Sequence, residues 1–261
     1  MASALIRGLI ARGVPATRLH ATDIAEGKLA SLAADCGINT GSTAMVTGAS
    51  DVVVLAVKPQ VMARACEAVS RNLAPGTLVV SIAAGITLTS LRRWLGPDTA
   101  LVRCMPNTPA LVGLGASGLY ADETVTSAQR ALAQSIMDAV GLSLWLPKEA
   151  DLDTVTALSG SGPAYFFLLM EAMQDAAIAL GLEPDAARQL TLQTALGAAQ
   201  LASSSTVSTA ELRRQVTSPG GTTERAISVF ESRGLRALVK DALAAAQQRS
   251  VELARDMDKP D

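Results

Sequence analysis

The first half of the chain alternates short apolar runs with stretches of helical periodicity. A continuous run rich in β-branched residues at 51–57 is typical of a strand buried on both faces of a parallel sheet. Two further strands are predicted at 78–82 and 101–105. Further strands are predicted at 19–22, 38–40, 116–121 and 142–146, and helices at 1–12, 25–36, 61–72, 87–95 and 126–139. The pattern therefore predicts an open α/β layer.

After residue 150 the strands give way to helices rich in alanine and leucine. We expect these helices at residues 151–159, 163–180, 184–202, 208–216, 222–232 and 235–255. A change of period marks a domain boundary, so the chain divides into an α/β domain over 1–148 and a helical domain over 149–261. Helices this rich in alanine pack closely and offer little bulk for a core of their own.

Between two of the predicted helices lies the run Ser-Pro-Gly-Gly-Thr-Thr-Glu at residues 218–224. Gly220 and Gly221 let the backbone approach a ligand, and Pro219 pre-sets a turn. The unpaired N–H groups of the helical turn that follows favour a carboxylate or a phosphate. The run indicates an anion-binding loop, and the alternative is an ordinary helix corner with a capped N-terminus.

Composition excludes several classes of function. A net charge of −2 and a pI near 5.5 leave no basic field for nucleic acid. The single histidine, His20, argues against a Ser-His-Asp hydrolase and against histidine-rich metal sites. Cys36, Cys66 and Cys104 show no C-x-x-C spacing, so we expect no metal site and a reducing compartment. No signal peptide or membrane span is indicated, and we expect a cytoplasmic protein.

Four segments together resemble the signatures of the pyrroline-5-carboxylate reductase family. They are AVKPQ at 56–60, RCMPNTPA at 103–110, SGSGPAY at 159–165 and QVTSPGGTTERA at 215–226. The resemblance runs from the first residue to about Asp256. It implies a Rossmann-like N-terminal domain and an all-α C-terminal dimerisation domain whose helices interlock between subunits, in a homodimer or a ring of dimers. The implied reaction is reduction of 1-pyrroline-5-carboxylate to L-proline by hydride from NAD(P)H, the last step of proline biosynthesis.

The resemblance and the strand ends together nominate site residues. Thr223 is the expected catalytic residue, because a cyclic imine can be protonated in solution and a hydroxyl at the ring nitrogen then suffices. The expected substrate-binding residues are Val216, Ser218, Gly220, Gly221, Thr222 and Thr223. The expected cofactor-binding residues are Asp23, Thr43, Ala56, Val57, Lys58, Pro59, Ala83, Ala84, Gly85, Met105, Pro106 and Asn107.

Several of these positions have a second interpretation. Asp23 either hydrogen-bonds a ribose 2′-OH and repels a 2′-phosphate, or caps the helix at 25–36. Lys58 faces the dinucleotide or is a solvated surface lysine, and Asn107 contacts a ligand or forms an Asx-turn. Residues 159–163 bring backbone near the cofactor or allow close helix packing. Thr43 stands where the family often has an asparagine, and we expect NADPH as cofactor, with NADH possible.

The beginning of the chain departs from the family pattern, which opens with a strand and a glycine-rich loop. Here residues 1–6 already have helical character, and no G-x-G-x-x-G precedes a strand. Because the first strand of a Rossmann layer is central, we expect a shortened version of a longer chain that forms the helical dimer and binds dinucleotide poorly.

Two other functions follow as alternatives. One is a non-catalytic or weakly active form that oligomerises through its helices. The other is a β-hydroxyacid dehydrogenase, which would need a lysine base in the helical half. That half offers Lys240 and Lys259 beyond the boundary residue Lys148, and none of them lies in a motif.

Overall fold

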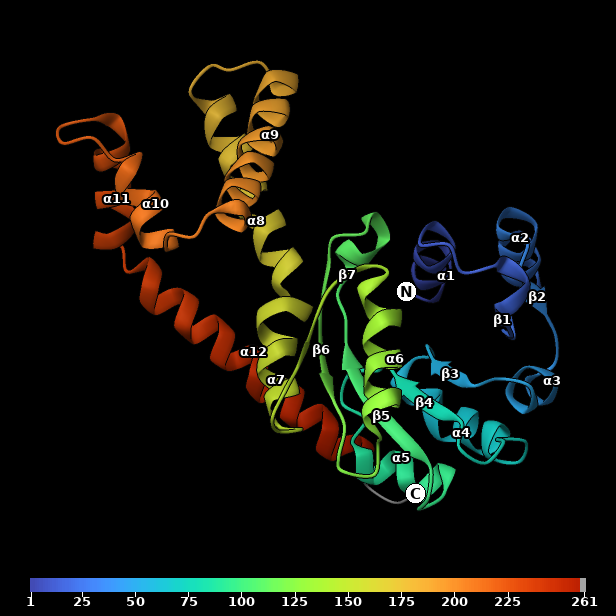
Figure 1. The fold of residues 1–261 in the computed structure, drawn as a ribbon. Helices are drawn as coiled ribbons and strands as arrows, with labels where there is room; N and C mark the ends of the chain where they lie inside the picture. Colours follow the sequence, from blue (N-terminus) through green and yellow to red (C-terminus); the bar gives the residue numbers. More distant parts are fainter. Residues whose placement is uncertain (259–261) are drawn as a thin grey trace. The chain divides into compact units, whose positions relative to one another are not determined.

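The computed structural model describes residues 1–258, whose strands form two separate sheets (Figure 1). The strands are β1 (His20–Ala21), β2 (Asn39–Thr40), β3 (Val52–Leu55), β4 (Leu78–Ser81), β5 (Ala100–Met105), β6 (Gly115–Tyr120) and β7 (Gly141–Trp145). β1 pairs with β2, and the larger sheet has the order β3-β4-β5-β6-β7. All pairs are parallel except β5 with β6, which is antiparallel. Lys259 lies outside the described residues.

The helices follow the predicted order, with one short addition. They are α1 (Ala2–Ala11), α2 (Glu26–Cys36), α3 (Thr43–Gly48), α4 (Met62–Ser70), α5 (Leu88–Leu95), α6 (Ser127–Asp138), α7 (Asp151–Val155), α8 (Gly162–Ala179), α9 (Pro184–Ser204), α10 (Thr209–Gln215), α11 (Thr222–Ser232) and α12 (Leu235–Asp258). The sequence analysis missed α3, which begins where the Ser42 hydroxyl accepts the Met45 N–H. The helix predicted at 151–159 is α7 followed by a π-helical turn, Thr156–Gly160.

Successive side chains of the larger sheet point to opposite faces, and each face has its own apolar core. Leu78 and Val80 pack with buried residues of α1 and α6, including Leu5 and Met137. Val79 packs on the other face with buried residues of α4 and α5. The sheet is therefore the middle layer of three, because alternate residues of a strand must each find an apolar partner.

The burial of β3 corrects one expectation. The sequence predicts burial on both faces for the run at 51–57, whereas the strand that is buried throughout is β4. In β3 only Val53 and Leu55 are buried, while Val52 and Val54 are half-buried. The reason is its position, since among the described strands β3 is hydrogen-bonded to β4 alone.

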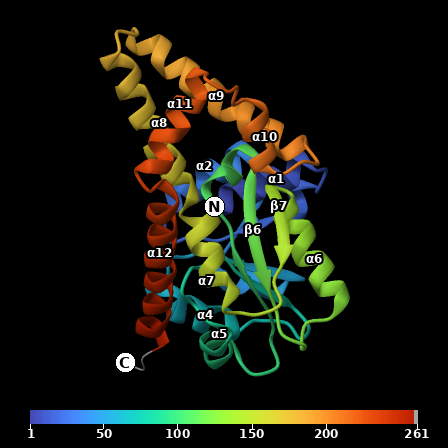
Figure 2. The ribbon, with the colours of Figure 1, turned by 90° about the vertical axis from the view of Figure 1, so that its left-hand side faces the viewer.

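The chain forms two compact units. The first comprises Met1–Ser161 and the chain from Ala245 onward, and the second comprises Gly162–Ala244. The first unit includes α7 and the end of α12, because the Ser250 hydroxyl donates to Asp153 and the Gln247 amide donates to the Thr154 hydroxyl, both at 2.7 Å. Figure 2 shows β6 and β7 side by side, with α6 beside β7.

The second unit exposes much apolar surface. Phe166, Phe167, Leu168 and Leu169 of α8 are between 48% and 65% exposed. Since consecutive residues of a helix point in different directions, this part of α8 is apolar on all sides, which is typical of helices buried in an assembly. No helix within residues 1–258 is both long and apolar enough to cross a bilayer.

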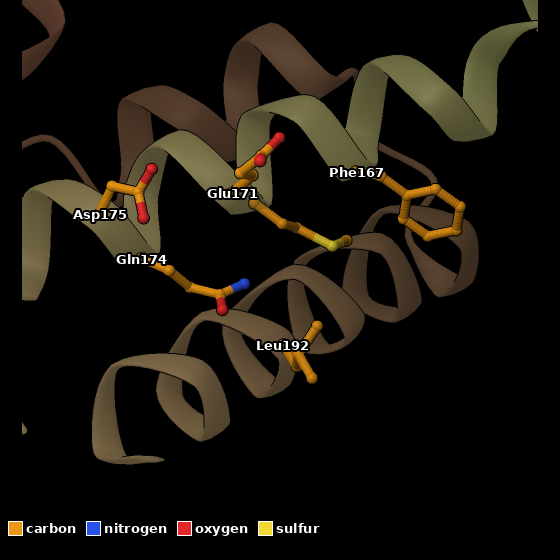
Figure 3. A pocket seen from close by; sticks show the side chains of 6 residues that line it. Phe167, Glu171, Gln174, Asp175 and Leu192 are labelled. Carbon is orange, nitrogen blue, oxygen red and sulfur yellow. The ribbon is translucent and has the colours of Figure 1, made fainter. Parts of the chain in front are cut away.

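A hollow between α8 and α9 contains none of the predicted site residues. Its lining is mixed, with Phe167, Met170, Glu171, Gln174 and Asp175 from α8 and Leu192 from α9 (Figure 3). The two carboxylates stand one helical turn apart, and among residues 1–258 no group of three or more metal-ligating side chains is placed to hold an ion.

Candidate active site

The carboxyl ends of β3, β4 and β5 meet at one edge of the larger sheet. These strands are parallel and in register, with Leu55 opposite Ser81 and Ser81 opposite Arg103. Open α/β sheets bind their ligands at this edge. The chain places there Ala56, Val57, Lys58 and Pro59 after β3, Ala83, Ala84 and Gly85 after β4, and Met105, Pro106 and Asn107 at the end of β5. The structure thus brings ten of the predicted cofactor residues to one edge.

These ten residues differ in the surface they offer. Ala56, Val57 and Lys58 are exposed; Pro59, Ala84 and Met105 are half-buried; Ala83, Gly85, Pro106 and Asn107 are buried. No ion pair involves Lys58 within residues 1–258, so its ammonium is available to an anion. The exposed and half-buried residues of this group combine mostly small side chains with one lysine. This combination fits a dinucleotide, whose phosphates the lysine can bind.

Gly85 is required by its backbone conformation rather than by a lack of space. Its φ is +72°, which favours glycine. An added Cβ would lie 3.5 Å from the Ala254 backbone nitrogen in α12, an ordinary packing distance. That small residues at this turn let the backbone approach a cofactor stays a prediction.

Asp23 and Thr43 lie with the smaller sheet. Asp23 follows β1 and is exposed, and its Oδ1 accepts the Ala25 N–H at 2.9 Å. The residue at the N-cap of α2 is Ala25, so Asp23 makes a turn before the helix rather than the predicted cap. Its other carboxylate oxygen is free for a ribose hydroxyl. Thr43 is half-buried at the first position of α3.

Asn107 is buried, and both ends of its amide bond to the protein backbone. Its Nδ2 donates to the Ser159 carbonyl at 3.0 Å, and its Oδ1 accepts the Ala116 N–H at 2.8 Å. An Asx-turn is excluded, because the bonded groups are far along the chain. The side chain instead joins the loop after β5 to β6 and to the π-helical turn, and only its second amide hydrogen remains for a ligand.

The π-helical turn packs directly against the end of β5. A Cβ on Gly160 would lie 2.6 Å from the Met105 methyl carbon, so this glycine admits the methionine side chain. This contact favours close packing at Gly160, one of the two interpretations of residues 159–163. Single π turns often occur at functional sites, and this one is not encoded by any local pattern that we recognise.

The predicted anion-binding loop lies in the second unit, between α10 and α11. The Gly221 N–H donates to the Ser218 carbonyl at 3.0 Å, and Gly220 has a φ of +71°. Proline at the second position and positive φ at the third define a type II turn. The Gly221 N–H is thus already paired, so the expectation that it binds a carboxylate is corrected, and the N–H groups of Thr222 and Thr223 remain for a ligand.

A carboxylate of the chain itself already interacts with this loop. The Gly220 N–H donates to the Glu224 Oε2 at 2.7 Å, and Glu224 is exposed in the first turn of α11. Glu224 follows Gly220 by four residues in the sequence, but the sequence analysis did not predict that its carboxylate accepts the Gly220 N–H. Val216, Ser218, Thr222 and Thr223 are also exposed, so the loop is open to solvent.

The helices that flank this loop are joined by one acid. Glu231 of α11 accepts from Arg213 of α10 at 3.1 Å and from Arg236 of α12 at 2.8 Å. The hydrogen bond from Arg236 lowers the pKa of the Glu231 carboxyl. These pairs are exposed and add little stability, and they join the end of α11 to α10 and to the start of α12.

Thiol chemistry is not available at the sheet edge. Burial raises the pKa of the Cys104 thiol, on β5, to about 12, and that of Cys66 to about 12 as well. Neither is a thiolate near neutral pH, and the thiolate is the reactive form. All three cysteines are free.

Two family models match the chain. The one described as "Pyrroline-5-carboxylate reductase dimerisation" covers residues 149–253. The one described as "NADP oxidoreductase coenzyme F420-dependent" covers residues 1–85.

Individual proteins are similar over almost the whole length. Pyrroline-5-carboxylate reductase from Pseudomonas aeruginosa is 55% identical over 258 residues, covering 98% of this chain and 94% of that protein. The solved pyrroline-5-carboxylate reductase from Coxiella burnetii has a TM-score of 0.94 at 47% identity, over 97% of this chain and 94% of the other. The Plasmodium falciparum pyrroline carboxylate reductase, solved with NADP bound, has a TM-score of 0.82 at 27% identity, over 97% and 94%.

Proposed function

The chain belongs to the pyrroline-5-carboxylate reductase family, and on that premise we propose that it reduces 1-pyrroline-5-carboxylate to L-proline, the last step of proline biosynthesis, with NADPH as its cofactor. One observation carries the proposal. The chain holds both parts that the reaction needs: an edge of three parallel strand ends suited to a dinucleotide and a helix N-terminus suited to a carboxylate.

The substrate carboxylate is assigned to the start of α11. Thr222 and Thr223 offer backbone N–H groups at the positive end of the helix dipole, and the Ser218 hydroxyl lies in the turn before them. An anion is favoured at such a position. Gly220 and Gly221 contribute the shape of the turn, and Val216 contributes an exposed apolar side chain beside it.

Thr223 is assigned the contact to the ring nitrogen. The protonated imine carries the positive charge that makes its carbon electrophilic, so the residues need only orient it. A threonine hydroxyl can accept a hydrogen bond from the iminium N–H. Holding the imine carbon in place is a positioning task, and well-oriented intramolecular reactions gain about 7 to 11 kcal/mol.

The dinucleotide is assigned to the sheet edge. Bound there, NADPH supplies the hydride. Lys58 would pair with a phosphate, Ala84 and Met105 would line the site, and Asp23 and Thr43 lie with the smaller sheet, where we place the adenosine half. We keep the functional division at 148/149, with residues 1–148 binding the dinucleotide and 149–261 serving assembly and substrate.

The full chain should reduce 1-pyrroline-5-carboxylate with a higher kcat/KM for NADPH than for NADH. Asp23→Asn keeps the bond to the Ala25 N–H and removes the negative charge. It should therefore raise kcat/KM for NADPH roughly tenfold, the effect of relieving about 1.4 kcal/mol of like-charge repulsion, and change that for NADH little. The control is Asp51→Asn, an exposed acid at the opposite end of β3.

Two results would count against this assignment. A tenfold preference of the wild type for NADH would show that the Asp23 charge decides the cofactor. No turnover of the imine with either cofactor would remove the proposed reaction itself.

Self-association through the helical half follows from the match to a dimerisation domain. We propose a homodimer that further assembles into a ring of dimers, because the apolar residues around α8 need more cover than one helix partner provides.

We also propose a cytoplasmic location, which three free cysteines suit, since a reducing compartment keeps thiols free.

The wild type should elute with a mass of at least twice 26.8 kDa in light scattering. Phe166→Asp places a charge on the apolar helix α8 and should shift the protein to monomer or prevent folding, because obligate dimers often lack a stable monomer. Ala68→Asp is the control, an exposed position on α4 outside the matched dimerisation segment. A monomeric wild type would refute the assembly.

A further inference from the structure

A partly buried ion pair lies directly behind the sheet edge that we assign to the dinucleotide. Arg103 is a charged residue within the apolar strand β5 and is 8% exposed. Its Nη1 donates to the Glu149 Oε1 at 2.7 Å. Arg103 stands two residues before Met105, so the pair anchors the strand where it enters the site.

The same carboxylate oxygen also holds the start of α5. The Leu88 N–H donates to the Glu149 Oε1 at 2.7 Å, and Leu88 is the first residue of that helix. An acid at a helix N-terminus is stabilised by the unpaired N–H groups and the dipole. Glu149 is therefore hydrogen-bonded to β5 and to α5, the helix that follows the loop after β4.

Glu149 itself begins the segment that matches the dimerisation family model. Its carbonyl accepts the Leu152 N–H at 3.1 Å, so it starts the turn that leads into α7. β5, α5 and α7 thus meet at one carboxylate. All of these residues belong to the first unit.

Stability alone does not explain such an arrangement. The desolvation of the buried Arg103 offsets much of its attraction to the partly exposed Glu149, and an apolar pair of similar volume is often as stable. An apolar pair, however, could not accept the Leu88 N–H. The Glu149 carboxylate instead fixes the distance between the loop before α5 and the end of β5, because the Leu88 N–H and the Arg103 guanidinium both donate to its Oε1 atom.

We propose that Glu149, held by Arg103, is a positioning residue for the dinucleotide: it sets the spacing between the loop Ala83–Gly85 and the end of β5. This inference rests on the proposed function, because it takes the sheet edge as the cofactor site. Neither residue of the pair is proposed to contact the cofactor or the imine. Its loss should therefore weaken dinucleotide binding selectively, because the loops would shift while the substrate loop in the second unit keeps its own contacts.

The test uses the full chain and two readouts: NADPH affinity by fluorescence titration, and steady-state KM for each substrate. Glu149→Ala removes both bonds and should raise the Kd and KM for NADPH about five- to tenfold, with KM for the imine changed less than twofold, the effect expected for loss of a hydrogen bond to a charged group. Glu149→Gln keeps an acceptor oxygen for both donors and should restore most of the affinity. Glu67→Ala, an exposed acid on α4, is the control.

Glu149→Asp covers the case in which the alanine variant does not fold. It keeps the charge but is one methylene shorter, so it cannot reach both donors, and KM for NADPH should still rise. An unchanged KM and Kd for NADPH in the folded aspartate or alanine variant overturns the inference, even if the melting temperature falls, because a purely structural role would affect stability alone. A wild type that binds no NADPH overturns the proposed function and this inference together. If the wild type turns over the imine with NADPH but the Glu149 variants bind NADPH unchanged, only the role of Glu149 is overturned.

Discussion

Thr223→Ala should lower kcat/KM for the imine about ten- to a hundredfold, or about 1.5 to 3 kcal/mol, the expected loss for one hydrogen bond to a charged group. Thr223 is the second residue of α11 and is exposed. Within residues 1–258 its hydroxyl has no hydrogen-bond partner, so it is free to orient toward a ligand. The N-cap of α11 is Gly221, without a side-chain bond, so Thr223 is not needed as a cap.

The neighbouring threonine provides the matched control. Thr222→Ala makes the same change one residue earlier in the same turn and keeps the backbone N–H that we assign to the carboxylate. It should leave kcat/KM within about twofold, because alanine is favourable in a helix. Thr223→Ser keeps the hydroxyl and should retain most of the activity. Unchanged turnover in Thr223→Ala, or equal losses in both alanine variants, would remove Thr223 from the mechanism.

The order and type of the main elements could be predicted because each depends on a local pattern. The apolar runs at 51–57, 78–82 and 101–105 became β3, β4 and β5, and the carboxyl ends of these parallel strands meet at one edge. The antiparallel pairing of β6 was not predicted, since nothing in a short apolar run fixes the direction of its neighbour. The π-helical turn was read as ordinary helix for a similar reason.

The partners of polar side chains could not be predicted, because they lie far apart in sequence. Arg103 within a buried strand signals that a partner exists, since an unpaired buried charge is costly, but Glu149 follows 46 residues later. Asn107 was chosen as a ligand contact for its polarity and position. Its bonds to Ser159 and Ala116 depend on how β6 and the π-helical turn pack against the loop.

Gly141 is where the largest loss of stability is expected. It opens β7 with a φ of +150°, and an added Cβ would lie 2.0 Å from the Gly115 carbonyl oxygen and 2.4 Å from the Gly115 nitrogen. These are backbone atoms of β6, and Gly115 is held in place because its N–H donates to the Val140 carbonyl at 2.8 Å. Gly141→Ala must therefore separate the two strands, and should lower the free energy of unfolding by more than about 4 kcal/mol.

Gly113→Ala is the matched control, because Gly113 is also in the left-handed region, at φ +73°, but an added Cβ would meet nothing within 4 Å. Its cost should be limited to the backbone conformation, about 1 to 2 kcal/mol. Because a 1 kcal/mol loss lowers the Tm by about 2 to 4 °C in domains of 150 to 250 residues, the two variants should separate clearly in thermal unfolding. Separation of β6 from β7 would also displace Ala116, which donates to Asn107, so Gly141→Ala should weaken NADPH binding in any fraction that remains folded. Equal melting temperatures for the two variants would show that the strands adjust to a side chain at Gly141.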